Sequence, residues 1–201
     1  MQKTKWFVTF KKNLQAKIRL IAFHHSGGAA STYFPWVKDL SSSIELIAIQ
    51  LPGREGRFHE PLINRIEEIT YNLSQEFLHY TDKPFFIFGH SLGALLGFEF
   101  AKSVQETYTT VPQHIIVSAT KAPHLPLRRK ELSQLDTPNL KAELSSYGGV
   151  ANEIINDEEL FNLFSPILRS DFSIYENYRY IETQPLLCNM LALSGAADYS
   201  V

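Results

Sequence analysis

The chain has 201 residues, enough for one domain with a substantial core and too few for two comfortable ones. Hydrophobic residues make up 44% and charged residues 20%, and a formal net charge of -2 gives no broad reason to expect nucleic acid or a membrane as a partner. The single cysteine, Cys188, excludes an internal disulfide and fits a reducing compartment. Since we find neither an export signal nor a run approaching the roughly 18 apolar residues of a membrane span, we expect a cytoplasmic protein.

The first predicted strand, at residues 17–23, is apolar and β-branched and runs directly into H-H-S-G-G-A-A-S. Glycines after a strand indicate a close backbone approach, and the N–H groups of Ser26 and Gly27 are candidates to bind an oxyanion. The alternative is a glycine-rich turn without a catalytic role. His24 and His25 lie in the same loop and are expected to shape the turn, because no metal-ligand spacing accompanies them.

Three further elements follow this loop. Residues 31–40 predict a helix with an aromatic buried face, residues 44–51 a strand, and residues 65–80 an amphipathic helix. A Pro-Gly turn after the strand carries Arg54 and Arg57. These arginines can meet a phosphate or a carboxylate; the alternative is a structural ion pair or a solvated loop.

The stretch P-F-F-I-F-G-H-S-L-G-A-L-L-G at residues 84–97 joins an apolar run, typical of a buried parallel strand, to a segment rich in helix formers. G-x-S-x-G in this setting indicates a nucleophile elbow, a turn so tight that the serine has a strained backbone. Gly89 and Gly93 are expected where strand and helix come too close for side chains. Ser91 is therefore the candidate nucleophile, and the N–H of Leu92 is a candidate oxyanion donor. The alternative is a chance occurrence of the motif.

Residues 113–119 predict another strand, and residues 188–194 the next. The alternation of strands and helices predicts an α/β fold, a mostly parallel sheet with helices on both faces. In such sheets ligands bind beyond the carboxyl ends of the strands, where both glycine loops are expected. Between these two strands, residues 125 to about 165 are expected to form a helical lid over this edge, with a further helix starting at Ser165-Pro166. The alternative is a segment that only covers a sheet face.

Six short blocks, spread over nearly the whole chain, carry a resemblance to one family. They are W-F at residues 6–7, H-S-G-G-A-A-S at 25–31, L-P-G-R-E-G-R at 51–57, F-G-H-S-L-G-A at 88–94, K-A-P at 121–123 and L-R-S-D-F-S-I-Y-E-N-Y-R-Y at 168–180. Together they resemble the type II thioesterases of nonribosomal peptide and polyketide synthesis, within the α/β-hydrolase superfamily. The third and sixth blocks are the most specific.

The resemblance implies hydrolysis of acyl thioesters on the phosphopantetheine arm of an acyl or peptidyl carrier protein, which clears stalled or misprimed acyl groups. It implies that Ser91 attacks the thioester carbonyl and that the backbone N–H groups of Leu92 and Ser26 hold the oxyanion. Asp198, after the strand at residues 188–194, is the implied triad acid that orients a histidine. The implied partner is the carrier protein, and neither a metal nor an organic cofactor is implied.

The triad histidine of this family follows the acid by some tens of residues, whereas this sequence has no histidine after His124. We therefore expect the N-terminal four-fifths of a single thioesterase domain, without the last strand and closing helix and with an exposed sheet edge. Turnover by this chain depends on the missing histidine, because serine without a general base is a weak nucleophile. Otherwise His25 or His90 would have to replace it.

Two other functions remain open from the sequence. A non-catalytic, carrier-binding remnant would keep the lid and docking surface, and it predicts carrier binding without hydrolysis. A generic serine esterase predicts a preference for simple oxygen esters over acyl thioesters on a carrier. The acyl group itself does not follow from the sequence, because the shape of the pocket depends on how the lid packs.

Overall fold

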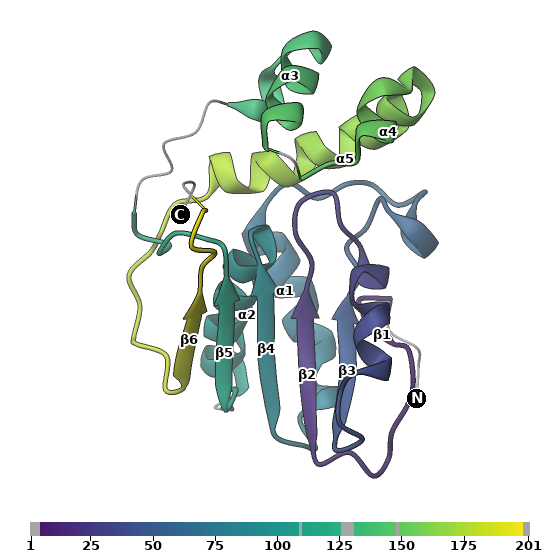
Figure 1. Cartoon of the computed structure of the whole chain (residues 1–201). Coiled ribbons are helices and arrows are strands. Elements are labelled where there is room, and N and C mark those ends of the chain that lie inside the picture. Colours follow the sequence, from purple (N-terminus) through teal and green to yellow (C-terminus); the bar gives the residue numbers. More distant parts are fainter. Residues whose placement is uncertain (1–4, 109, 126–130, 148, 199–201) are drawn as a thin grey trace.

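A six-stranded sheet forms the centre of the protein, whose computed structural model describes residues 5–108, 110–125, 131–147 and 149–198 (Figure 1). The strands are β1 Phe7–Thr9, β2 Ile18–Phe23, β3 Ile44–Ile49, β4 Phe85–His90, β5 His114–Ser118 and β6 Asn189–Leu193. Their order in the sheet is β1-β3-β2-β4-β5-β6. All neighbours pair in parallel except β1, which is antiparallel to β3, so the predicted mostly parallel sheet is confirmed.

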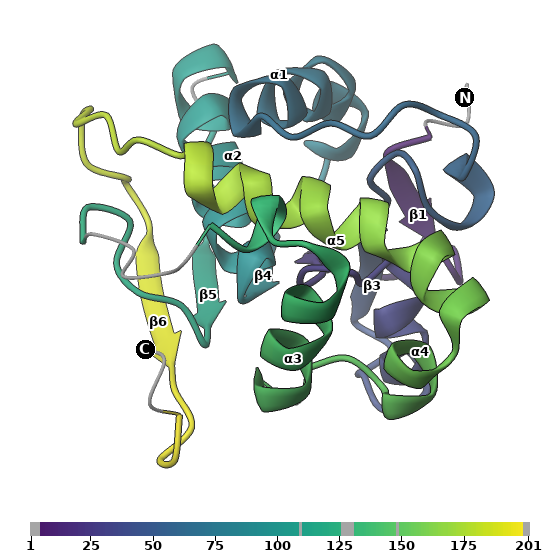
Figure 2. The same ribbon diagram turned by 90° about the horizontal axis from the view of Figure 1, so that it is seen from above.

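Helices cover both faces of the sheet, as predicted. Figure 2 shows α1 (Ile66–Phe77) and α2 (Leu92–Tyr108) on one side. Their core includes Phe23 of β2, which is 1% exposed and whose ring centroid lies 5.5 Å from that of Phe100 of α2. On the other side, the 3-10 helix η1 (Ala30–Lys38) packs its buried Tyr33 near Ala22 and Ala48. The alternation of side chains along β2 and β3 thus supplies two separate apolar layers.

A third layer lies beyond the carboxyl ends of the strands (Figure 1). It consists of α3 (Thr137–Tyr147), α4 (Asn152–Asn156) and α5 (Glu158–Asn177), together with the short 3-10 helix η4 (Leu132–Gln134). These helices share an apolar cluster of their own, which contains Leu132, Leu140, Leu144, Ile155, Phe161 and Leu168. The helical segment therefore covers the carboxyl ends of the strands, where the lid was expected. Its opening and closing stay a prediction.

α5 is one continuous helix, and Asp157 caps its N-terminus. It runs unbroken through Ser165 and Pro166, so the expected helix start there is wrong, and the expected lid boundary near residue 165 falls inside the helix. Pro166 removes one N–H from the helical ladder, but the carbonyl left without a donor belongs to Asn162, which is exposed and can bind water. Burial of Ile167 and Leu168 directly after the proline keeps the helix continuous.

The two edge strands differ from the predictions and from the central strands. β1 was not predicted, because three residues are too few to show alternation; it is held by pairing with β3, where Phe7 lies opposite Ile49. At the other edge, β6 pairs with β5, and all five of its residues are exposed. The expectation that further elements follow β6 stays a prediction. None of the helices in the described ranges is long and apolar enough to cross a membrane.

Candidate active site

Ser91 occupies the tight turn between β4 and α2 with φ +54°, a left-handed conformation that residues other than glycine rarely adopt. Its N–H donates to the carbonyl oxygen of Ser118 at 2.8 Å, which ties the turn to β5. A Cβ atom on Gly89 would lie 2.1 Å from the carbonyl oxygen of Gly93, and a Cβ on Gly93 would lie 2.0 Å from that of Phe23. The strained elbow and the two close backbone approaches expected from G-H-S-L-G are therefore present.

The elbow leaves the candidate nucleophile beside a helix terminus. Ser91 is half-buried, and its hydroxyl has no hydrogen-bond partner among the residues that the structure describes. Leu92 is the first residue of α2, where backbone N–H groups have no acceptor within the helix. Because the positive end of the helix dipole lies at the same point, negative charge developing next to Ser91 would be stabilised. Leu92 is thus placed as the prediction requires, and its role as an oxyanion donor stays a prediction.

The glycine loop at residues 24–28 leaves the sheet beside the elbow, because Phe23 of β2 pairs with Gly89 of β4. Two N–H groups of this loop were candidates for the second oxyanion donor. The Gly27 N–H is engaged, since it donates at 2.7 Å to Oδ2 of Asp171 on α5. Within the described ranges the Ser26 N–H has no partner. Of the two candidates, Ser26 is therefore the available one.

His24 is buried beneath this loop, with 1% of its surface exposed. Its Nδ1 donates to the carbonyl oxygen of His25 at 2.8 Å, and its Nε2 has no partner among the described atoms. Burial, reinforced by the nearby Arg54 guanidinium, lowers the pKa of His24 to about 4. His24 is therefore neutral at pH 7 and shapes the turn, as expected. In the described part of the chain, no three His, Cys, Asp or Glu side chains are grouped to hold a metal ion.

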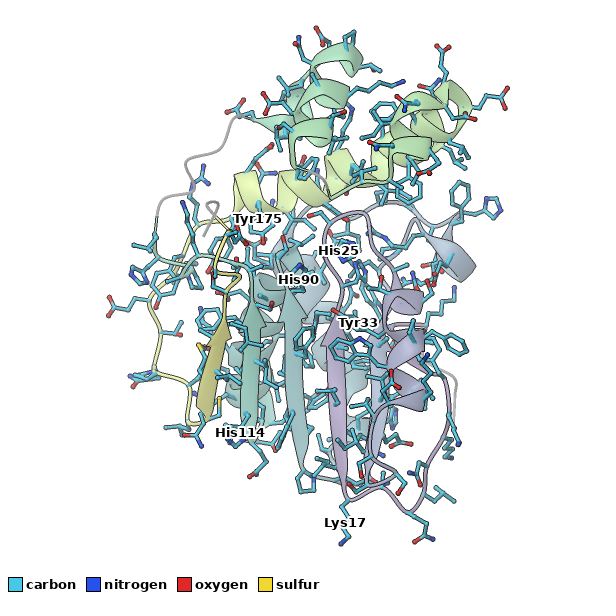
Figure 3. All side chains as sticks on the ribbon, viewed as in Figure 1. Lys17, His25, Tyr33, His90, His114 and Tyr175 are labelled. Atoms are coloured by element: carbon cyan, nitrogen blue, oxygen red, sulfur yellow. The ribbon has the colours of Figure 1, made fainter. Side chains whose placement is uncertain are left out.

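His25 and His90, the possible replacements for the catalytic base, face each other at the carboxyl ends of β2 and β4 (Figure 3). Their ring centroids lie 6.1 Å apart, with an angle of 81° between the ring planes. His90 is directed toward β5, where its Nδ1 lies 3.1 Å from Oγ of Ser118. Burial and the neighbouring His90 lower the pKa of His25. Neither ring has a hydrogen bond to Ser91 within the described residues, so a replacement base stays a hypothesis.

Asp198 follows β6 at the same edge of the sheet. Strand pairing aligns His90 of β4 with Ser118 of β5, and Ser118 with Leu193 of β6, so all three strands end together. β6 lies two strand spacings from β4, roughly 10 Å. This distance leaves room for an imidazole between a serine that follows β4 and an acid that follows β6. Asp198 is half-buried, and its N–H donates to the carbonyl oxygen of Gly195 at 3.0 Å. Its role as the triad acid stays a prediction.

Comparison with known proteins assigns this arrangement to a family. Residues 18–198 match the family described as the thioesterase domain. The chain belongs to the thioesterase domain family. By family it is a hydrolase, and its α/β-hydrolase fold is that of the type II thioesterases.

Two curated relatives and one solved structure resemble this thioesterase over almost its full length. Linear gramicidin dehydrogenase LgrE of Brevibacillus parabrevis is 35% identical over 206 residues, which cover 98% of this chain and 78% of LgrE. Gramicidin S biosynthesis protein GrsT of Aneurinibacillus migulanus is 34% identical over 200 residues, which cover 100% of this chain and 78% of GrsT. The structure of the type II thioesterase BorB from the borrelidin biosynthetic cluster matches with a TM-score of 0.89 at 31% identity, over 100% of this chain and 82% of BorB.

The thioesterase fold also brings together two charged residues that the sequence did not connect. Arg54, after β3, and Asp171, on α5, form a bidentate ion pair with N–O distances of 2.8 and 2.9 Å. Arg57 pairs with Glu60 at 2.7 Å, so the structural alternative holds for both arginines of that turn. The available signal for Asp171 was its position three residues from both Leu168 and Ile174, on the apolar face of a helix, because a buried carboxylate requires a partner.

Proposed function

We propose that this thioesterase hydrolyses acyl thioesters carried on the phosphopantetheine arm of a carrier protein during nonribosomal peptide or polyketide synthesis. The observation that carries the proposal is the strained elbow at Ser91, flanked by the available N–H groups of Leu92 and Ser26, in a chain of the thioesterase family. The names of GrsT and BorB, which refer to gramicidin S biosynthesis and to a type II thioesterase of the borrelidin biosynthetic cluster, support this substrate class.

In the proposed reaction, Ser91 transfers its hydroxyl proton to a general base as its oxygen attacks the thioester carbonyl. The carbonyl oxygen becomes an oxyanion, which the N–H groups of Leu92 and Ser26 stabilise; one such donor is worth about 3 kcal/mol in serine hydrolases. Collapse breaks the C–S bond, the protonated base returns its proton to the sulfur so that the carrier thiol leaves, and an acyl ester remains on Ser91. Water then attacks that ester and releases the acid. The proposed chemistry needs neither a metal nor an organic cofactor.

The general base has two proposed sources. One is a histidine from sequence beyond residue 201, oriented by Asp198 in the order Ser, Asp, His. The other is His25 or His90, which lie at the carboxyl ends of the strands, beside the elbow. Extension of the chain and substitution of these two histidines separate the two sources.

The name of LgrE refers to dehydrogenase chemistry, which this sequence does not favour. The dinucleotide fingerprint G-x-G-x-x-G lets a loop backbone approach a pyrophosphate closely. No two glycines of this chain are separated by a single residue. We therefore do not extend a dehydrogenase activity to it.

Single-turnover hydrolysis of an acyl group loaded on a carrier protein tests the proposal. We would compare this chain, Ser91→Ala, and the chain extended by any coding sequence that follows residue 201. Ser42→Ala, an exposed serine at the amino end of β3, is the matched control. A Ser91-dependent hydrolysis, at least about 1,000-fold slower in Ser91→Ala, is the expected result.

The alternatives give different results in the same assay. Carrier binding without hydrolysis by any version indicates the non-catalytic remnant. Faster cleavage of simple oxygen esters than of the acyl carrier indicates a generic esterase. Hydrolysis that survives Ser91→Ala overturns the elbow as the site.

A further inference from the structure

Asp171 and Arg54 hold the glycine loop by both its N–H and its carbonyl groups. The Asp171 carboxylate accepts the Gly27 N–H at 2.7 Å, and both of its oxygens accept from Arg54. Arg54 also donates from Nη1 to the carbonyl oxygen of Gly28 at 3.2 Å. Asp171 is fully buried and Arg54 is 4% exposed, so water does not compete for these bonds. We call Arg54 and Asp171 the loop clamp.

The loop held by this clamp has a conformation that depends on contacts from α5. Gly27 has φ +75°, and a Cβ at this position would lie 2.7 Å from Cδ2 of Leu168, one turn before Asp171 on α5. The Gly28 N–H closes a tight turn by donating to the carbonyl oxygen of His25 at 3.0 Å. The Gly27 and Gly28 N–H groups are both engaged, whereas the Ser26 N–H has no partner within the described ranges and can donate to an oxyanion.

Stability alone does not account for a buried ion pair here. A buried pair gains little over well-packed apolar side chains, because desolvation offsets the attraction between the charges. Apolar side chains, however, cannot accept the Gly27 N–H or donate to the Gly28 carbonyl. The clamp thus gives hydrogen-bond partners to the Gly27 N–H and the Gly28 carbonyl oxygen, which an apolar core would leave without them.

We propose that Arg54 and Asp171 are positioning residues of the thioesterase reaction, which hold the glycine loop so that the Ser26 N–H meets the oxyanion. This inference rests on the proposed function. Because Asp171 lies on α5, the donor is in place only while α5 is seated on the loop. The clamp therefore acts on the transition state, in which the oxyanion exists, and not on the uncharged thioester.

A second buried ion pair in the same chain is a matched control. Arg19 (8% exposed) donates from Nε to Glu45 (5% exposed) at 2.9 Å and from Nη1 to the carbonyl oxygen of Tyr80 at 2.9 Å. It lies near the amino ends of β2 and β3, whereas the elbow lies at the carboxyl ends of the strands (Figure 1). Disrupting this pair perturbs stability without touching the glycine loop.

The test compares Asp171→Asn and the double variant Arg54→Met/Asp171→Leu with the control Arg19→Met/Glu45→Leu, in whichever chain length hydrolyses the acyl carrier. We expect kcat to fall about 100-fold in the clamp variants, as for loss of one oxyanion donor, with KM changed less than about 3-fold. An acyl trifluoromethyl ketone, which forms a tetrahedral adduct with serine, should bind weaker by a similar factor. Because the control removes the hydrogen bond from Arg19 to the carbonyl oxygen of Tyr80, it should lower the melting temperature with kcat nearly unchanged. Equal losses of kcat in clamp and control variants, or an effect on KM alone, overturn the proposal.

Hydrogen exchange gives a readout that needs no turnover. The amides of residues 24–28 should exchange faster in Asp171→Asn than in the wild type, and unchanged in the control variant. Unchanged exchange in Asp171→Asn overturns the clamp even if the chain is an active thioesterase. If no version hydrolyses an acyl carrier while this exchange responds to Asp171→Asn, the proposed function fails and the positioning of the loop is upheld.

Discussion

Gly93 lies against the carbonyl oxygen of Phe23 with no room for a side chain, because a Cβ atom at residue 93 would be 2.0 Å from that oxygen and 2.7 Å from the carbonyl oxygen of His24. The contact joins the first turn of α2 to the last residue of β2. The elbow and the glycine loop are thus packed backbone to backbone. A missing side chain therefore determines how close the candidate nucleophile lies to the candidate oxyanion donors.

Gly93→Ala should destabilise the protein strongly. The added methyl group overlaps backbone atoms on β2, which cannot move aside as a flexible side chain can, so we expect a loss of more than about 3 kcal/mol. Urea denaturation measures it. Gly56→Ala is the control, because a Cβ there meets nothing within 4 Å and the change should stay within about 0.5 kcal/mol. Equal stability of the two variants would contradict the close approach.

Ser91→Gly should raise the free energy of unfolding while abolishing hydrolysis. The φ of +54° is strained for serine and costs glycine nothing, so relief of that strain should add about 1 kcal/mol after the greater flexibility of the unfolded chain is subtracted. Ser91→Ala also lacks the nucleophile but keeps the Cβ and the strain. Chemical denaturation should therefore rank Ser91→Gly above Ser91→Ala, and the reverse order would show that the elbow is unstrained.

Stability should fall as the pH drops from 6.5 toward 4, because of His24. Folding lowers the pKa of this buried histidine from 6.5 to about 4, so between these values the unfolded chain binds more protons than the folded one. The free energy of unfolding therefore rises with pH across this window, by up to about 3 kcal/mol from His24. Urea denaturation at pH 7 and pH 4.5 should show a smaller difference for His24→Gln than for the wild type. An unchanged difference would rule out a buried, neutral His24.

Tyr33→Phe should weaken the end of β2, where the glycine loop begins. The Tyr33 hydroxyl donates to the carbonyl oxygen of Phe23 at 2.6 Å, and burial of this side chain to 3% exposure raises its pKa. Its loss leaves a buried carbonyl without that donor and should cost about 1–2 kcal/mol. Tyr71→Phe, on an exposed tyrosine of α1, should change the stability by less than about 0.5 kcal/mol. Similar losses for both would mean that the buried hydrogen bond contributes nothing.

The local features of this protein could be predicted because their causes are local. The central strands show as apolar runs, and the elbow shows as two glycines at fixed distances from Ser91, since the clash that they relieve arises within the same turn. The predictions failed where a distant partner decides. β1 exists through its pairing with β3, and α5 continues through Pro166 because the residues after the proline are buried against other helices.

The α/β fold, the elbow at Ser91 and the glycine loop beside it follow from the amino-acid sequence. Which N–H groups of that loop are engaged, and which carboxylate Arg54 pairs with, depend on the tertiary structure. Arg54 and Asp171 are 117 residues apart in the chain; Arg54 follows β3, and Asp171 lies within α5. Their ion pair forms because the end of β3, the glycine loop and α5 meet at the carboxyl ends of the strands. No periodicity or short motif encodes such a meeting, since it depends on the packing of three elements at once.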